Sequence, residues 1–280
     1  MTAPGVYRSR PSGVESLFGK KKAIVAVIHS KPLPGSPEYD GESITELYAY
    51  ALEEARRFAT GGVNALILEN HGDIPFLKPG DIGHETTATM AVMAELIRQE
   101  TGLPIGINVL ANGALTAIAV AKAAGAGFIR VNQWANAYVA NEGFVEGEAA
   151  KVTRYRSWLR AKSIKVFADV HVKHGSHAIV ADRSIKELTR DVEFFDADVV
   201  IATGQRTGDA ATTKEIQTIK AATSLPVLVG SGVNVDNIFE ILSVADGVII
   251  ASSLKRDGLW WNEVDTDRVA VFMEQVRRLQ

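Results

Sequence analysis

The 280-residue sequence contains no cysteine. This absence excludes disulfide bridges, thiolate nucleophiles and cysteine-ligated zinc, and it is typical of proteins of a reducing compartment. The sequence also lacks an apolar run long enough to cross a bilayer, and its N-terminal segment lacks the hydrophobic core of a signal peptide. We therefore expect a cytoplasmic protein without a transmembrane segment.

An excess of charge of one sign is missing too. The chain has 30 Lys and Arg residues against 33 Asp and Glu residues, which gives a net charge of −3 at pH 7. Such a balance argues against a broad positive footprint for nucleic acid, and although it leaves a local basic patch open, the sequence has no basic stripe interleaved with aromatic residues. We expect no nucleic-acid partner.

What is present is a recurring unit, in which a turn of small residues precedes a short apolar run and a segment of helical periodicity. Strands that alternate with helices pair in parallel through right-handed crossovers. No dinucleotide-binding glycine motif follows the first run, which disfavours a doubly wound open sheet. The pattern predicts an α/β fold, a single (β/α)8 TIM barrel over residues 21–280, preceded by a flexible N-terminal leader over residues 1–20. The eight predicted strand segments are 21–30, 61–70, 103–112, 124–132, 164–172, 196–204, 225–233 and 245–253.

Chemically capable residues gather at the carboxyl ends of these segments, where TIM barrels build their active sites. In "FADVHVKHGSH" (167–177), Asp169, His171 and Lys173 alternate and are expected to project from one face of a strand. Together with Glu69, these three are the predicted catalytic residues. The predicted substrate-binding residues are His29, Asn70, His71, Asn108, Arg130, Asn132 and Thr203.

Two turns near the C-terminus, "VLVGSGV" and "IIASSLK", have the composition of a phosphate site. Glycine lets backbone N–H groups approach an anion closely, and the loops after the last two strands commonly hold phosphate in this fold. The nearby Lys255 and Arg256 either add positive charge there or point into solvent. The predicted phosphate-binding residues are Gly230, Ser231, Gly232, Ala251, Ser252 and Ser253.

Three mechanisms remain open for these residues. Glu69 and Asp169 can act as an acid/base pair while Lys173 stabilises a developing oxyanion, which is the alternative we favour. Lys173 can instead form a Schiff base with a carbonyl substrate. In a third alternative, ranked last, His29, Glu69, Asp169 and His171 hold a divalent metal. The sequence itself requires no cofactor.

Six separated motifs, "IHSKPLPGSP", "ENHGDIPF", "GINVLAN", "FIRVNQW", "FADVHVKH" and "VLVGSGV", resemble the BtpA family in the expected order, over residues 22–260 approximately. The resemblance implies a barrel like those of phosphosugar enzymes. The family takes its name from a cyanobacterial factor for photosystem I biogenesis that is peripheral to the thylakoid membrane.

We therefore predict an enzyme that acts on a phosphorylated sugar or nucleoside-derived small molecule, as an isomerase, as a lyase or aldolase, or by cleaving a glycosidic bond. The alternative that the resemblance implies is a non-catalytic factor for photosystem I biogenesis or stability. Long loops over residues 27–41 and 71–87 are expected to act as lids or to form an interface between copies of the chain. We expect a homo-oligomer.

Overall fold

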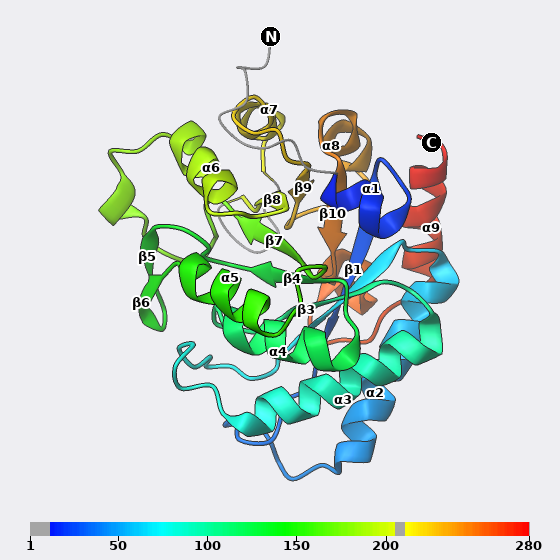
Figure 1. Ribbon diagram of the computed structural model, residues 1–280. Helices are drawn as coiled ribbons and strands as arrows, with labels where there is room; N and C mark the ends of the chain where they lie inside the picture. Colours follow the sequence, from blue (N-terminus) through cyan, green and yellow to red (C-terminus); the bar gives the residue numbers. More distant parts are fainter. Residues whose placement is uncertain (1–11, 205–210, 280) are drawn as a thin grey trace.

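The computed structural model describes residues 12–204 and 211–279 (Figure 1). Eight parallel strands close into a barrel in which each strand pairs with two neighbours. The (β/α)8 TIM barrel is thereby confirmed, and each predicted strand segment contains one strand of the ring. In order around the barrel, the strands are β1 (Ala23–His29), β10 (Gly247–Ile250), β9 (Val227–Val229), β8 (Val199–Ala202), β7 (Lys165–Asp169), β4 (Phe128–Val131), β3 (Ile105–Asn108) and β2 (Ala65–Glu69).

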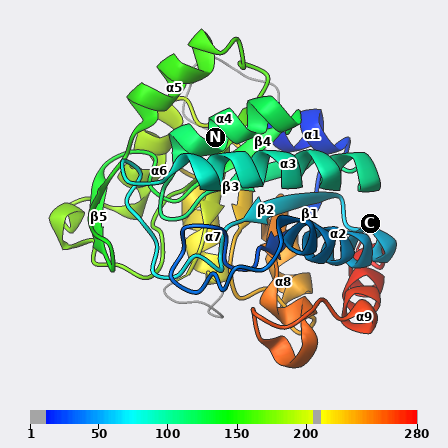
Figure 2. The ribbon, with the colours of Figure 1, turned by 90° about the horizontal axis from the view of Figure 1, so that it is seen from below.

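Helices lie outside the strands and cover the ring (Figures 1 and 2). Local sequence signals set several of their ends. Helix α2 (Ile44–Gly61) begins at a capping box, in which Ser43 and Glu46 satisfy each other's backbone N–H groups, and its C-cap residue is Gly62 with a φ of 92°. The helices that follow strands of the ring are α2 (Ile44–Gly61), α3 (His84–Thr101), α4 (Ala114–Ala124), α5 (Ala149–Trp158), α6 (Ile185–Phe194), α7 (Thr213–Lys220), α8 (Ile238–Val244) and α9 (Thr266–Arg277), with short 3-10 turns η1 (Ala178–Val180), η2 (Ser252–Leu254) and η3 (Arg256–Gly258).

The strands are buried on both faces because alternate residues enter different cores. In β1, Ile24, Ala26 and Ile28 pack outward against the helices, whereas Val25 and Val27 face the barrel interior. Each fully buried Val, Leu or Ile side chain stabilises the fold by about 1.5–3 kcal/mol relative to an exposed one. This alternation decides which residue of each strand points into the barrel at its carboxyl end.

Helix α1 (Gly13–Phe18) closes the amino-terminal end of the barrel. Val14 is buried against the interior core, and the Phe18 ring packs edge-on against Phe128 at 5.7 Å and Phe167 at 6.2 Å between centroids. The prediction of a flexible leader over residues 1–20 does not fit helix α1, because the apolar face of the helix packs against the amino-terminal end of the barrel. Residues 1–11 of that leader lie outside the described part of the chain.

A two-stranded antiparallel hairpin, β5 (Ala137–Ala140) and β6 (Gly143–Glu146), lies between β4 and α5 and was not predicted. Its Tyr138 side chain is buried and stacks on His177 with 5.2 Å between ring centroids. The hairpin therefore supports the loop that follows β7.

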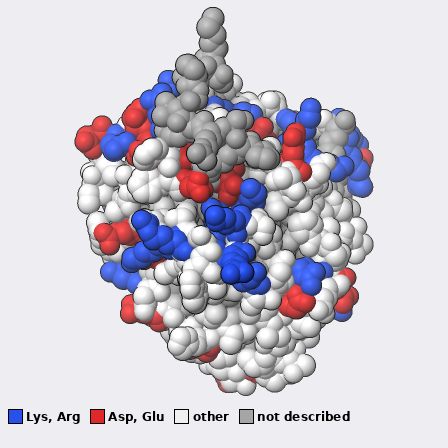
Figure 3. All heavy atoms as spheres, viewed as in Figure 1, with Lys and Arg blue, Asp and Glu red and all other residues white. Residues whose placement is uncertain are grey.

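None of the described helices combines the length and the apolar character that a bilayer span needs. On the face of the molecule shown in Figure 3, lysine and arginine side chains lie interspersed with acidic ones rather than in one continuous stripe.

Candidate active site

One layer of side chains crosses the barrel interior at the carboxyl ends of the strands. Each strand contributes either its last inward-facing residue or the residue that directly follows the strand on the same alternation, and parallel strands end at the same rim. Six of these eight positions are polar. The layer consists of His29, Glu69, Asn108, Arg130, Asp169, Thr203, Gly230 and Ala251.

Glu69 lies at the centre of a buried cluster on β1, β2 and β3. Its Oε1 atom is 3.0 Å from Nδ1 of His71 and 3.8 Å from Nε2 of His29, and its Oε2 atom accepts a hydrogen bond from Asn108. Burial acts to raise the pKa of Glu69, but the hydrogen bond with His71 and the charges of His71 and Arg130 hold it well below its usual value. Glu69 is therefore an ionised carboxylate with both oxygens engaged.

His29 is neutral in this environment, because burial lowers its pKa to about 3. Its Nδ1 atom lies 3.3 Å from the carbonyl oxygen of Trp260, which can only accept a hydrogen bond. The proton of the ring is thus on Nδ1, and Nε2 presents a lone pair toward Glu69. The Trp260 ring also packs edge-on against His71, at 4.5 Å between centroids.

Asp169 and Arg130 form a two-pronged ion pair inside the barrel. Arg130 donates from Nε to Oδ1 at 3.2 Å and from Nη2 to Oδ2 at 3.1 Å, and Asn132 adds a bond to Oδ2 at 3.3 Å. Burial raises the pKa of Asp169, while Arg130 acts in the opposite direction. Since both carboxylate oxygens are in use, this acid is held in place rather than free to move.

Lys173 follows β7 and contacts the turn after β9. Its Nζ atom donates a 3.0 Å hydrogen bond to Oγ of Ser231. Burial, assisted by the positive charge of Arg130, lowers the pKa of Lys173 to about 8, although Glu69 and Asp169 oppose the shift. Lys173 therefore holds its proton less tightly than an exposed lysine does.

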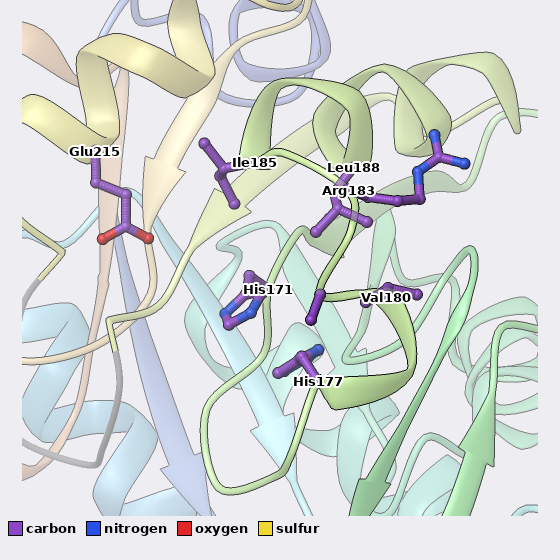
Figure 4. Close-up of a pocket in the computed structure, with 8 residues that line it drawn as sticks. His171, His177, Val180, Arg183, Ile185, Leu188 and Glu215 are labelled. Atoms are coloured by element: carbon purple, nitrogen blue, oxygen red, sulfur yellow. The ribbon is translucent and has the colours of Figure 1, made fainter.

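His171 does not join Glu69, Asp169 and Lys173. Strand β7 ends at Asp169, so the alternation that placed His171 on the same face does not continue beyond it. The His171 ring stacks on His177 at 3.7 Å and lines a neighbouring pocket of about 440 Å³ (Figure 4). The pocket is lined by His171, His177, Val180, Ala181, Arg183, Ile185, Leu188 and Glu215.

The two predicted phosphate loops lie side by side, since the Ser253 hydroxyl donates a 2.7 Å hydrogen bond to the carbonyl of Val233. Gly230 is tightly enclosed: a Cβ atom there would lie 2.6 Å from Ile201 and 3.3 Å from Nη2 of Arg130. Gly232 has a φ of 68°, a conformation that favours glycine.

Lys255 belongs neither to the phosphate loops nor to the solvent-exposed surface. It is completely buried, and its Nζ atom lies 2.8 Å from Oε2 of Glu54 and 3.0 Å from the carbonyl of Asn262. Both expectations for this lysine were wrong, because its acidic partner lies 201 positions away in the sequence.

Two further predicted substrate-binding residues, Asn70 and Thr203, form hydrogen bonds within the protein. The Asn70 amide is fully engaged in holding the loops after β2 and β3, through Asp73 and both backbone groups of Leu110. Thr203 donates to the carbonyl of His171 at 3.0 Å. Sequence reasoning missed Trp260, although the dipeptide "WW" soon after the last strand was a visible signal at this rim.

The BtpA family model matches residues 20–278. The chain belongs to the BtpA family. Photosystem I biogenesis protein BtpA of Synechocystis sp. is 35% identical over 258 residues, which cover 92% of this chain and 88% of that protein. An uncharacterized protein of Methanocaldococcus jannaschii is 39% identical over 261 residues, 93% of this chain and 97% of its own length. A Caenorhabditis elegans relative, 34% identical over 95% of this chain and 98% of its own length, is named as mitochondrial.

Solved structures resemble this BtpA-family chain in fold alone. N-(5'-phosphoribosyl)anthranilate isomerase from Pyrococcus furiosus aligns with a TM-score of 0.56 at 15% identity, covering 91% of this chain and 99% of that one. Tryptophan synthase from M. tuberculosis aligns with a TM-score of 0.59 at 16% identity, covering 95% and 99%. Both are consistent with the barrel.

Proposed function

We propose that the chain is an enzyme that acts on a phosphorylated sugar or nucleoside-derived small molecule at the carboxyl rim of its barrel. The observation that carries this proposal is the 3.0 Å hydrogen bond between Lys173 and Ser231. This bond brings the one amine of the site to the glycine-rich turn where we expect the phosphate. Reacting groups and anion site are then within the reach of one small substrate.

Lys173 is the proposed proton-transfer group. A general acid or base works best when its pKa lies near the working pH, and the pKa of Lys173 is lowered to about 8. Glu69 is a weak base because its pKa is held low, and Asp169 is bound by Arg130. Acid/base isomerisation or lyase chemistry by Lys173, with Arg130 stabilising negative charge, follows from this comparison.

A Schiff base is the second mechanism for the same lysine. The neutral amine would attack a carbonyl carbon to form a C–N bond, and the nitrogen would lose its two protons as the carbonyl oxygen gains two and leaves as water. Borohydride reduction in the presence of substrate distinguishes the two mechanisms. It produces a stable adduct on Lys173 only if an imine forms, whereas acid/base catalysis leaves the mass of the protein unchanged.

Thermal unfolding with a library of sugar phosphates and their unphosphorylated counterparts tests the substrate class. We expect phosphorylated compounds alone to raise the Tm, and the variant Ser231→Asp to lose this rise because its carboxylate repels phosphate. Ser157→Asp, on the exposed face of α5, is the matched control and is expected to keep it. The proposal fails if no phosphorylated compound raises the Tm, or if Ser231→Asp responds like the wild type.

As a second candidate function we propose a non-catalytic factor, peripheral to the membrane, for photosystem I biogenesis or stability. The name of the Synechocystis relative, photosystem I biogenesis protein BtpA, supports the biogenesis role. Complementation of a Synechocystis strain that lacks its own BtpA tests it. Restored photosystem I content with both the wild type and Lys173→Met supports a non-catalytic factor. Restoration by the wild type alone supports an enzymatic role, and no restoration by either argues against this function for the chain.

A homo-oligomer and a cytoplasmic location remain proposals. Two large aromatic side chains near the ends of α5 and α6 support self-association, since Trp158 is 76% exposed and Phe194 65% exposed. Light scattering of the wild type and Trp158→Ser measures the state, and a monomeric wild type would contradict the oligomer. Fractionation of the source cells measures the location.

A further inference from the structure

We propose that His29, Glu69 and His71 form a binding site for one divalent transition-metal ion, of which Zn²⁺ is the representative. One ligand atom from each residue lies within 4.8 Å of the other two. The donors come from the end of β1, the end of β2 and the first turn after β2. This site does not depend on the proposed phosphosugar chemistry, because it is argued from the donor atoms alone.

The spacing of the donors suits a metal. With bonds of about 2.1 Å in tetrahedral geometry, ligand atoms lie about 3.4 Å apart. The Oε1 atom of Glu69 lies 3.0 Å from Nδ1 of His71 and 3.8 Å from Nε2 of His29, values on either side of that distance. The nitrogens of His29 and His71 lie within 4.8 Å of each other, so binding requires the two imidazoles to close on the ion while Glu69 stays in place.

Outer contacts hold two of the three donors in place, as is usual around metal ligands. His29 and Glu69 are paired residues of adjacent strands, and the ring of His29 is fixed by its hydrogen bond to the carbonyl of Trp260. Asn108 donates to Oε2 of Glu69 and leaves Oε1 to the two imidazoles. Such a cluster is organised before any ion binds.

An independent observation points to a ligand here. The side chain of Asn108 is 1% exposed, and its Oδ1 atom has no hydrogen-bond partner among the described residues. An unpaired buried amide oxygen is costly, by about 1–3 kcal/mol. Because the amide nitrogen of the same side chain contacts Glu69, a water bound to the metal is well placed to donate to this oxygen.

The donor set selects the class of ion. Two imidazole nitrogens and one carboxylate oxygen suit zinc, cobalt, iron or nickel, whereas magnesium and calcium prefer all-oxygen sites. Three protein ligands leave at least one position open, as in catalytic zinc sites. The ion could there polarise a substrate oxygen or activate a bound water.

This ligand set differs from the one expected from the sequence, in which Asp169 and His171 accompanied His29 and Glu69. Both carboxylate oxygens of Asp169 accept hydrogen bonds from Arg130, and His171 stacks against His177 in the neighbouring pocket. His71 replaces them, because the chain turns immediately after β2 and brings its ring back to Glu69.

The experiment uses full-length protein that has been treated with a chelator. One sample is titrated with Co²⁺ while the visible d–d absorption is measured. A second sample is incubated with Zn²⁺ and desalted, and its bound zinc is measured by elemental analysis. We expect one equivalent per chain for the wild type and for His84→Ala, an exposed histidine outside the cluster. His71→Ala and Glu69→Gln are expected to weaken binding by at least about tenfold. A wild type that binds no equivalent, or variants that bind like it, would overturn the site in favour of a metal-free His71–Glu69 pair.

Two features keep this test decisive. If Glu69→Gln or His71→Ala fails to fold, histidine modification by diethylpyrocarbonate on the wild type replaces it: bound Zn²⁺ must protect His71 while His84 stays reactive, and equal reactivity of His71 with and without Zn²⁺ overturns the site. No phosphorylated compound is present. A failed metal titration therefore leaves the phosphosugar proposal standing, and a failed phosphosugar screen leaves the metal site standing.

Discussion

Lys173 donates a hydrogen bond of 3.0 Å from its Nζ atom to the hydroxyl of Ser231. The first residue follows β7 and the second follows β9, so the bond spans the end of the intervening strand β8. A buried ammonium group at this place lowers the free energy of unfolding. The predictions below concern this group and the charged and packed residues around the barrel.

Replacing Lys173 by methionine should stabilise the protein at pH 7. The pKa of Lys173 falls from 10.5 to about 8 on folding, so below pH 8 the folded state carries a charge that burial disfavours. The unfolded chain binds more protons between pH 8 and 10.5, and wild-type stability therefore rises through this interval. We expect Lys173→Met to be more stable by about 1–3 kcal/mol at pH 7 and the difference to vanish near pH 10.5. Denaturant unfolding across the pH range measures it, and a difference that is independent of pH would contradict the assignment.

Replacing Arg130 by methionine should be strongly destabilising. The variant leaves the buried Asp169 carboxylate without its two-pronged partner, and the loss of one member of such a pair costs about 3–5 kcal/mol. The double variant Arg130→Met/Asp169→Asn removes both charges and should recover a large part of this loss. Urea unfolding of the single and double variants measures the coupling. Additive effects would mean that the two residues do not act as a pair.

Gly230→Ala should disturb the turn after β9. Its Cβ atom would lie 2.6 Å from the buried Ile201 side chain, and such overpacking costs about 1–3 kcal/mol. The Tm should fall, and any rise caused by phosphorylated compounds should shrink with it. Gly80→Ala is the control, because nothing lies within 4 Å of a Cβ at that exposed position. Equal stability of the two variants would show that the turn has room to spare.

Phe18→Ala should destabilise the whole barrel, although the residue precedes the first strand. The side chain covers Phe128 and Phe167 at the amino-terminal end, and removal of a packed phenylalanine costs about 3–5 kcal/mol when the side chain is fully buried. Phe18 is only partly buried, so we expect a loss at or below the lower end of that range. Lys20→Ala, at an exposed position nearby, should leave the Tm unchanged. A Tm for Phe18→Ala equal to that of the wild type would mean that residues 12–20 do not stabilise the barrel and form part of the leader, as the sequence predicts.

The eight strands could be predicted because each one produces a strong local signal. A strand buried on both faces is a short apolar run between turn residues, as in "AIVAVIH" and "ALILE", and its length separates it from a helix. The hairpin β5–β6 gives no such run: of its residues only Tyr138 and Val145 are buried, and Gly143 and Glu146 lower its strand signal. It was therefore missed.

The site could be predicted only as far as the strand pairing reaches. Glu69 and Asp169 are inward-facing strand residues, and the period of two places them correctly. His171 lies two positions beyond the end of β7, where stacking on His177 rather than strand geometry decides its direction. Trp260 and the Lys255–Glu54 pair depend on contacts between distant parts of the chain, which no local pattern reveals.

The buried bridge between Glu54 and Lys255 joins helix α2 to the segment that follows β10, next to the seam where β1 meets β10. During synthesis, β1 can pair with β10 only after almost all of the polypeptide has emerged from the ribosome. Closure of the ring is therefore a late event, and Glu54 remains without its cation until then. Slow translation near the 3' end of the messenger RNA would lengthen the time during which β1 exposes an unpaired, aggregation-prone edge.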